Sequence, residues 1–168
     1  MKPKEYKILY KKGVKYAQNS EYHKALEYYD KALALYKEDS RLWLDKALSL
    51  IKLKNYSDSL YCTEEGLKLK QNDADLWTYK GLSLEGLGIK NSDNKLIEES
   101  IECYDKATNI NPKHYYAWLN KAMMLSRLDK REESVKAYDV VLKLKPRDPI
   151  SMHNRRILLQ EIKELKRD

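Results

Sequence analysis

Histidine and cysteine are the side chains in this sequence from which metal binding or nucleophilic chemistry would start. The three histidines, His23, His114 and His153, lie far apart and have no cysteine or carboxylate at metal-ligand spacing. The sequence has no HExxH or paired CxxC motif, and it lacks the GxGxxG, GxxxxGK(S/T) and GxSxG patterns that bind nucleotides or expose a nucleophile. We therefore expect no catalytic residue, no metal site and no cofactor, and we do not expect an enzyme.

Tryptophan, lysine and small residues instead recur at a fixed spacing. An apolar residue, Trp, two variable residues, Lys and a Gly or Ala follow one another at 42–47, 76–81 and 117–122. Tyr-Asp-Lys-Ala occurs at 29–32 and 104–107, with a degraded copy at 138–141. Together these patterns divide the chain into units at 6–39, 40–73, 74–114, 115–148 and a partial unit at 149–166. Three complete units are 34 residues long, and the third carries a seven-residue insertion.

The units resemble the tetratricopeptide-repeat (TPR) family, in which two helices pack within about 34 residues. Small residues at positions eight and twenty would let the two helices approach closely. They are Gly13, Ala47, Gly81 and Ala122 at position eight, and Ala25, Ser59, Ser100 and Ser134 at position twenty. Pro112 and Pro146 match the family's closing proline. The resemblance implies an all-α, right-handed α-α superhelix of four helix-turn-helix repeats plus a C-terminal capping helix, forming a single TPR domain over 1–168.

Position seven departs from the family, which places Leu there. This chain has Lys12, Lys46, Lys80 and Lys121, with Arg155 in the partial unit. One interpretation is an apolar stem packed along the helix with its charged end in water. The alternative is a row of basic groups that meets an acidic partner.

The insertion of the third unit falls within 88–95, and we predict a loop there between the two helices. Gly88 would end the first helix, and Ser92, Asp93 or Asn94 would cap the second. Such a loop is either a tolerated surface feature or a contact for a ligand or neighbouring subunit.

Composition supports a helical protein. The chain has 5 Gly, 4 Pro and no Phe in 168 residues, and its net charge of +7 comes from 33 Lys and Arg against 26 Asp and Glu. Acids and bases are interleaved along the chain, which favours solvated helix faces over a nucleic-acid surface. No apolar run approaches the roughly 20 residues that span a bilayer, and no signal peptide follows the N-terminus, so we expect a cytoplasmic protein without a membrane segment.

The two cysteines, Cys62 and Cys103, hold the same position in successive units. Packed helices would keep them at least about 8–10 Å apart, whereas a disulfide needs Cα atoms closer than about 7 Å. We therefore predict free thiols.

The resemblance also implies where a ligand would bind, because the first helix of each repeat lines the concave face in this family. Inward-facing positions hold Lys7, Tyr10, Lys11, Val14, Arg41, Leu44, Asp45, Leu48, Ile51, Asp75, Thr78, Tyr79, Leu82, Tyr116, Leu119, Asn120 and Met123, with Ile150, Asn154 and Ile157 on the cap. From these we select as the partner-binding groove Tyr10, Val14, Leu44, Leu48, Tyr79, Leu82, Tyr116, Leu119, Asn120 and Met123. No frame of the chain contains the complete Lys, Asn, Asn, Lys and Arg clamp with which one TPR subclass holds a chaperone tail.

An apolar groove with a few polar groups suits a peptide or helix of another protein. We therefore expect a protein-protein interaction scaffold whose partner is a protein or peptide. A homo-oligomerising adaptor is the first alternative, and an RNA-binding helical repeat is a weaker one, since RNA-reading repeats place polar residues where this groove is largely apolar.

Overall fold

The computed structural model describes residues 4–167, and in this range the chain forms α-helices and no strands. The helices are α1 (Lys4–Gln18), α2 (Tyr22–Leu35), α3 (Ser40–Lys52), α4 (Tyr56–Leu69), α5 (Ala74–Asn91), α6 (Asn94–Ile110), α7 (Tyr115–Arg127), α8 (Arg131–Leu144) and α9 (Pro149–Leu165). The ends of the predicted domain, residues 1–3 and residue 168, lie outside the described residues. None of the helices in 4–167 is long and apolar enough to span a bilayer.

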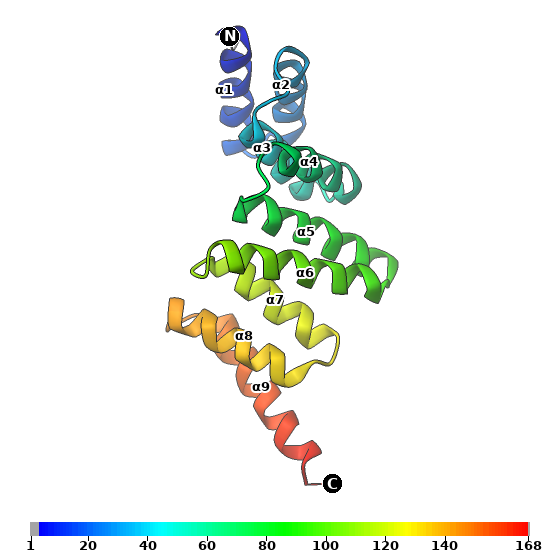
Figure 1. Ribbon diagram of the computed structural model, residues 1–168, viewed down its shortest axis with the longest axis vertical. Coiled ribbons are helices and arrows are strands. Elements are labelled where there is room, and N and C mark those ends of the chain that lie inside the picture. Colours follow the sequence, from blue (N-terminus) through cyan, green and yellow to red (C-terminus); the bar gives the residue numbers. More distant parts are fainter. Residues whose placement is uncertain (1–3, 168) are drawn as a thin grey trace.

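The all-α prediction is confirmed. Consecutive helices pack in pairs, α1 with α2, α3 with α4, α5 with α6 and α7 with α8, and α9 packs on α8. Figure 1 shows these pairs stacked along one long axis, with the N-terminus at one end and the C-terminus at the other. The residue ranges assigned above to the four units and the cap remain our proposed division of the chain.

Aspartates begin four of the helices. The side chains of Asp39, Asp73, Asp93 and Asp148 accept hydrogen bonds from the free backbone N–H groups at the starts of α3, α5, α6 and α9. A carboxylate at this position also complements the positive end of the helix dipole. The local sequence therefore fixes where these helices start.

The turn inside each pair contains one residue in the left-handed backbone region. These residues are Ser20, Lys54, Ser92 and Asp129, with φ between 55° and 62°. Glycine would adopt this conformation at less cost, but none of the glycines in 4–167 has a positive φ. The glycines of this chain are used for packing instead.

Two of these glycines let a tyrosine ring lie directly against the opposite helix. A Cβ on Gly81 would lie 2.5 Å from Tyr104 Cε1, and a Cβ on Gly13 would lie 2.5 Å from Tyr29 Cε1. Both rings are fully buried. The hydroxyl of Tyr104 donates to Glu85 Oε2 at 2.5 Å, which satisfies the polar end of the buried ring.

Two of the three serines at position twenty are also satisfied across the pair, whereas Ser100 donates to the carbonyl of Ile97 in its own helix. Ser59 Oγ donates to the carbonyl of Ala47 at 3.1 Å, and Ser134 Oγ donates to the carbonyl of Ala122 at 2.7 Å. Each bond joins the two small residues at which the helices cross. A serine can therefore replace the apolar small residue at this crossing without leaving a buried hydroxyl unpaired.

The prediction of a loop at 88–95 is wrong, because the insertion lengthens both helices. Helix α5 is five residues longer than α3 and α7, and α6 is three residues longer than α4 and α8. Gly88 lies inside α5, where a Cβ would come 2.7 Å from Ile97 Cδ1, so this glycine permits close packing and does not end the helix. Of the three candidate caps, Asp93 is the residue that caps α6. The lengthened α5–α6 pair extends beyond α4 and α7 on the right of Figure 1.

Cys62 and Cys103 are both free and buried, in α4 and α6. Burial raises the pKa of the Cys62 thiol to about 12 and that of the Cys103 thiol to about 11. Both thiols are therefore protonated at neutral pH, and their role in the fold is packing.

Candidate functional site

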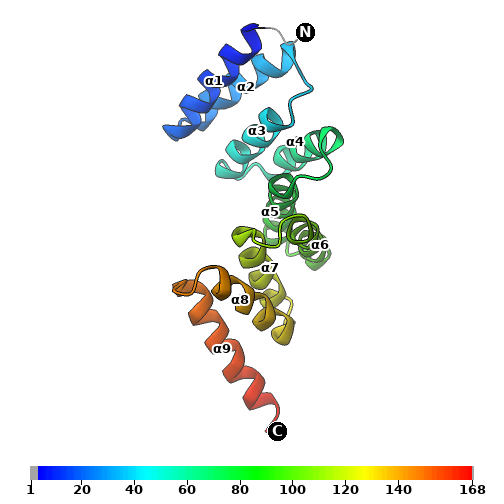
Figure 2. The ribbon, with the colours of Figure 1, turned by 60° about the vertical axis from the view of Figure 1, so that its left-hand side comes forward.

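The first helices of the pairs form one side of the stack. Helix α3 contacts α1 and α5, and α5 also contacts α7, whereas successive second helices in 4–167 make no comparable contacts with each other. The stack must therefore curve with its first helices on the inner side. Figure 2 shows this progressive rotation of the pairs along the axis. We call the inner surface of α1, α3, α5, α7 and α9 the groove.

The predicted groove residues differ in how far they are exposed. Leu44 and Leu119 are buried, at 4% and 8% exposure, because they belong to apolar core clusters that include residues of second helices. Tyr116 and Met123 are the exposed members, at 65% and 38%. The remaining six are half-buried: Tyr10, Val14, Leu48, Tyr79, Leu82 and Asn120.

Position nine of the first helices carries an apolar residue in every unit. Successive helices place there Val14, Leu48, Leu82, Met123 and Ile157. All five keep some exposure, and none belongs to the fully buried core. The groove therefore has an apolar row along its length, with one side chain contributed by each first helix.

Polar contacts link neighbouring first helices. Tyr10 of α1 donates its hydroxyl hydrogen to Asp45 Oδ2 of α3 at 2.5 Å, and Arg41 lies 3.3 Å from the other oxygen of Asp45. Burial raises the pKa of Asp45, although the hydrogen bond from Tyr10 and the charge of Arg41 oppose that rise. Farther along the stack, His114 Nε2 lies 3.0 Å from Asp75 Oδ1. These contacts join α1 to α3 and α5 to α7, which keeps the inner face in one arrangement.

Two hollows open onto the groove. One of about 300 Å³ lies between α1 and α3 and includes Val14 and Leu48. A larger one, of about 520 Å³, lies between the ends of α3 and α5 and includes Ile51 and Leu82. Both volumes are in the range of pockets that receive small molecules or peptide side chains.

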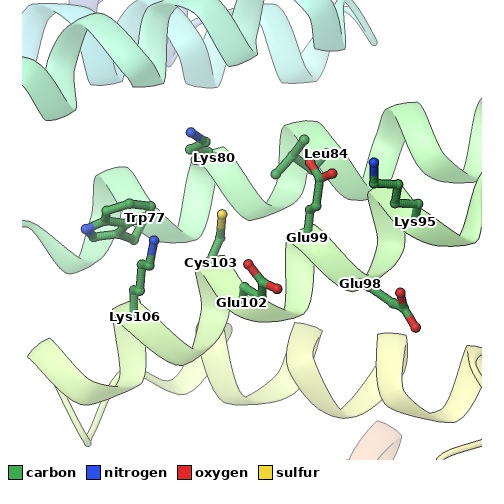
Figure 3. Close-up of a pocket in the computed structure, with 9 residues that line it drawn as sticks. All are labelled: Trp77, Lys80, Leu84, Lys95, Glu98, Glu99, Glu102, Cys103 and Lys106. Carbon is green, nitrogen blue, oxygen red and sulfur yellow. The ribbon is translucent and has the colours of Figure 1, made fainter.

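The outer face has hollows as well, and they recur with the repeat. Figure 3 shows the one between α5 and α6, of about 460 Å³, whose lining includes Lys80, Glu102, Cys103 and Lys106. Hollows of about 280 and 250 Å³ occupy the corresponding places in the second and fourth units. Their lining mixes acids and bases, and none of the His, Cys, Asp and Glu side chains in 4–167 gather into a group that could hold a metal ion. The groove is therefore the better candidate for a site.

Residues 10–74 match the tetratricopeptide repeat family, and residues 115–148 match it again. The chain belongs to the tetratricopeptide-repeat family. Residues 97–128, which include most of α6 and all of α7, also match the protein prenyltransferase alpha subunit repeat. No curated protein matches the sequence.

Solved TPR structures share this fold. A thermophilic TPR protein from Thermus thermophilus has a TM-score of 0.77 and 15% identity, with 94% of this chain and 82% of that chain covered. YrrB, described as a TPR protein with an unusual peptide-binding site, has a TM-score of 0.76 and 21% identity, covering 88% and 73% of the two chains. The first TPR of Spaghetti (RPAP3), bound to the HSP90 peptide SRMEEVD, has a TM-score of 0.64 and 18% identity, covering 73% and 94%. At these identities the likeness establishes the fold alone.

Four of the five basic residues at position seven of this TPR protein form ion pairs within the fold. Each contacts an acidic residue on the second helix of the preceding unit, in the pairs Lys46–Asp30, Lys80–Glu64, Lys121–Asp105 and Arg155–Asp139. Three of the lysines also lie over the ring of a tryptophan one turn earlier, as Lys80 does at 5.8 Å from Trp77. The four cations that follow another unit are therefore neutralised between repeats, and their charges are not a free row for an acidic partner.

Sequence reasoning missed the partners inside the groove. It placed Arg41, Asp45 and Asp75 on the inner face without a contact, and it treated His114 as an ordinary structural or surface histidine. The spacing of Tyr10 and Asp45 could have predicted their contact. They are 35 residues apart, which is one repeat plus one residue, so they meet on adjacent first helices. His114 was harder to assign because the insertion in the third unit shifts it to 39 residues from Asp75.

Proposed function

We propose that this TPR scaffold binds a short segment of a partner protein in its groove. The observation that carries the proposal is the apolar row at position nine, where every first helix presents a partly exposed side chain. Exposed apolar surface of this extent in a folded protein commonly marks an interaction site. The peptide-binding site named for YrrB and the HSP90 peptide on the first TPR of Spaghetti show that this fold can hold peptides.

The groove favours a ligand with apolar anchors. Leu48, Leu82 and Met123 would contact apolar side chains of the partner, while Asn120 and Tyr79 offer hydrogen bonds that fix its orientation. The carboxylate clamp is incomplete in every frame, so we do not expect the partner to be a chaperone tail held by its terminal carboxylate.

Affinity capture with a groove variant tests the proposal. Tyr116→Asp combined with Met123→Asp replaces two exposed side chains of α7, so the variant should fold while its groove repels apolar anchors. Leu119 is unsuitable for this purpose because it belongs to the buried core. Leu35→Asp combined with Leu69→Asp is the matched control, since it adds the same charge at two exposed leucines of second helices, at 42% and 45% exposure.

Proteins retained by wild type and by the control, but lost from the groove variant, would support groove binding. Mass spectrometry identifies them, and melting curves confirm that all three proteins are folded. Retention of the same proteins by the groove variant would place binding elsewhere and overturn the proposal.

A second candidate function is self-association through α9. Helix α9 packs on α8 and exposes Ile150, Met152, Leu159 and Leu165, at 51%, 53%, 40% and 62%. Sedimentation across a range of protein concentrations tests this self-association. The wild type is compared with a variant that combines Met152→Asp and Leu159→Asp. A sedimentation coefficient that is independent of concentration would remove this candidate.

A further inference from the structure

The hollow between the ends of α3 and α5 is the larger of the two that open onto the groove, at about 520 Å³. Four of the residues that line it have largely apolar side chains: Ile51, Tyr56, Leu82 and Ile89. Ile51 and Leu82 lie at inward-facing positions of α3 and α5, so the hollow is continuous with the groove. A ligand in the groove can therefore place a side chain in it.

The insertion of the third unit builds the outer wall of this hollow. Helices α3 and α7 end at Lys52 and Arg127, both at position thirteen of their units, and the equivalent residue of α5 is Gly86. Ile89 and Lys90 belong to the part of α5 that continues beyond this point. The same part extends past its neighbours in Figure 1. A repeat without the insertion would lack this wall.

Part of the lining of the hollow is a tyrosine ring that packs on a glycine. A Cβ on Gly86 would lie 2.4 Å from Tyr56 Cδ1, so the half-buried Tyr56 ring lies directly on the backbone of α5. This contact ties the start of α4 to α5 within the lining of the hollow. Ile89 is 42% exposed beside it, which leaves an apolar surface without a partner within the described chain.

The rim of the hollow is basic. Lys54 and Lys90 line it, and neither forms an ion pair with any residue in 4–167. This distinguishes them from the lysines at position seven that follow another unit, which are neutralised between repeats.

Glu85 is the one acid among the lining residues. It accepts the hydrogen bond of Tyr104, and burial raises its pKa, against the opposing effects of that bond and of Arg127. The two cations at the rim therefore outnumber this single, already hydrogen-bonded carboxyl.

We propose that this hollow is a subsite of the groove that takes one large apolar side chain of the partner peptide, with acidic residues beside it that contact Lys54 and Lys90. The proposal rests on groove binding and specifies its ligand: an acidic segment with an apolar anchor. The apolar walls supply affinity, and the two cations select the charge of the flanking residues.

Defined peptides test the subsite. The probes are three heptapeptides: a central Leu flanked on each side by three Asp or Glu, the same peptide with Ser for Leu, and the same Leu peptide flanked by Lys. Carbon-13 methyl NMR of Ile51 and Ile89 reports on the subsite, and the methyl group of Met123 reports on the rest of the groove. Fluorescence polarisation of labelled peptides gives the dissociation constants.

The acidic Leu peptide should shift the Ile51 and Ile89 methyl signals, and the Ser and Lys peptides should bind about tenfold more weakly or not at all. Lys54→Glu combined with Lys90→Glu should weaken the acidic Leu peptide about tenfold and strengthen the Lys-flanked one. Lys136→Glu combined with Lys143→Glu makes the same charge change at exposed lysines of α8 and should leave both affinities unchanged. Raising the salt concentration should reduce the effect of the Lys54 and Lys90 changes.

The outcomes separate the subsite from groove binding itself. Shifts at Met123 without shifts at Ile51 and Ile89 would overturn the subsite and leave the groove as a peptide site. Equal binding of acidic and basic peptides would also overturn the subsite, because the rim would then have no charge preference. Absence of any shift with all three peptides would overturn it as well, while the capture experiment with the α7 variant would still decide whether the groove binds a partner.

Discussion

Gly81 is a position where a helix interior needs glycine, although alanine is ordinarily the better helix former by roughly 0.5–1 kcal/mol. A Cβ there would lie 2.5 Å from the fully buried ring of Tyr104, which is also held by its hydrogen bond to Glu85. We expect Gly81→Ala to lower the free energy of unfolding by about 1–3 kcal/mol, the usual cost of overpacking. Urea denaturation measures it.

Gly86→Ala is the matched control for this substitution. It makes a contact of the same closeness, 2.4 Å from Tyr56 Cδ1, but the half-buried Tyr56 ring can move toward solvent. Its loss of stability should therefore be smaller. A Gly81→Ala variant more stable than wild type would contradict the packing that we assign to Tyr104.

The stability of the fold should depend on pH through the carboxyl group of Asp148. Burial alone would raise its pKa, but hydrogen bonds from Tyr115, Ser151 and Lys145 outweigh burial and hold the pKa well below its ordinary value. A lowered pKa contributes stability that is present above the unfolded-state pKa, near 4, and is lost as the pH falls toward the folded-state value.

We therefore expect Asp148→Asn to cost about 1–2 kcal/mol at pH 7, because asparagine can still cap α9 but lacks the charge that these hydrogen bonds stabilise. The difference between wild type and variant should shrink as the pH falls below about 4. Thermal melting across this pH range measures it. A difference that stayed constant between pH 7 and pH 2 would show that the charge of Asp148 contributes nothing.

At the scale of the helices, the sequence predicted correctly which helices pair, but it did not predict how long the two helices of the third unit are. The repeating Trp, Lys and small residues predicted which helices pair, since the same contacts return with each unit. Gly88 and the polar residues after it indicated a turn, because the packing of Ile97 on Gly88 is not visible in a linear sequence. Leu44 and Leu119 were assigned to the groove for a similar reason: position indicates the direction of a side chain but not how closely the next helix covers it.

The ion pairs between units could have been found from spacing alone. Each acid precedes its base by 16 residues, as Glu64 precedes Lys80 and Asp139 precedes Arg155. This interval joins the second helix of one unit to the first helix of the next. A search for opposite charges repeated at that interval would have assigned the position-seven lysines to the fold.

Lys80→Glu tests the contribution of these pairs. It places a negative charge beside Glu64 and removes the cation over Trp77, so we expect a loss of about 1 kcal/mol at low salt. Lys12→Glu is the control, because Lys12 has the same position in the first unit but forms no ion pair with any residue in 4–167. Denaturation at low and high salt measures both, and equal effects of the two variants would contradict a role between repeats.

Across residues 4–167, most of the buried apolar residues gather into three groups of unequal size. The largest lies in the third and fourth units and includes Tyr104 and Tyr138, and a second lies mainly in the first two units and includes Tyr29 and Trp43. The junction between the second and third units relies on a small third group, Leu44, Leu67 and Leu76. In a repeat protein, the interfaces between neighbours decide whether the array unfolds as one unit, so this junction decides whether the two large groups unfold together.

Leu76→Ala tests the coupling across this junction directly. Leu76 is 1% exposed, and its Cδ2 lies 2.6 Å from where a Cβ of Gly66 would be, so it closely fills the space between α4 and α5. We expect the truncation to cost about 2–5 kcal/mol and to uncouple the two halves. Hydrogen exchange should then show α1–α4 losing protection at lower denaturant concentration than α5–α9, because the larger core lies in the second half. Equal loss of protection along the chain would mean that the array remains cooperative across α4 and α5, and that Leu76 is not needed to couple the two halves.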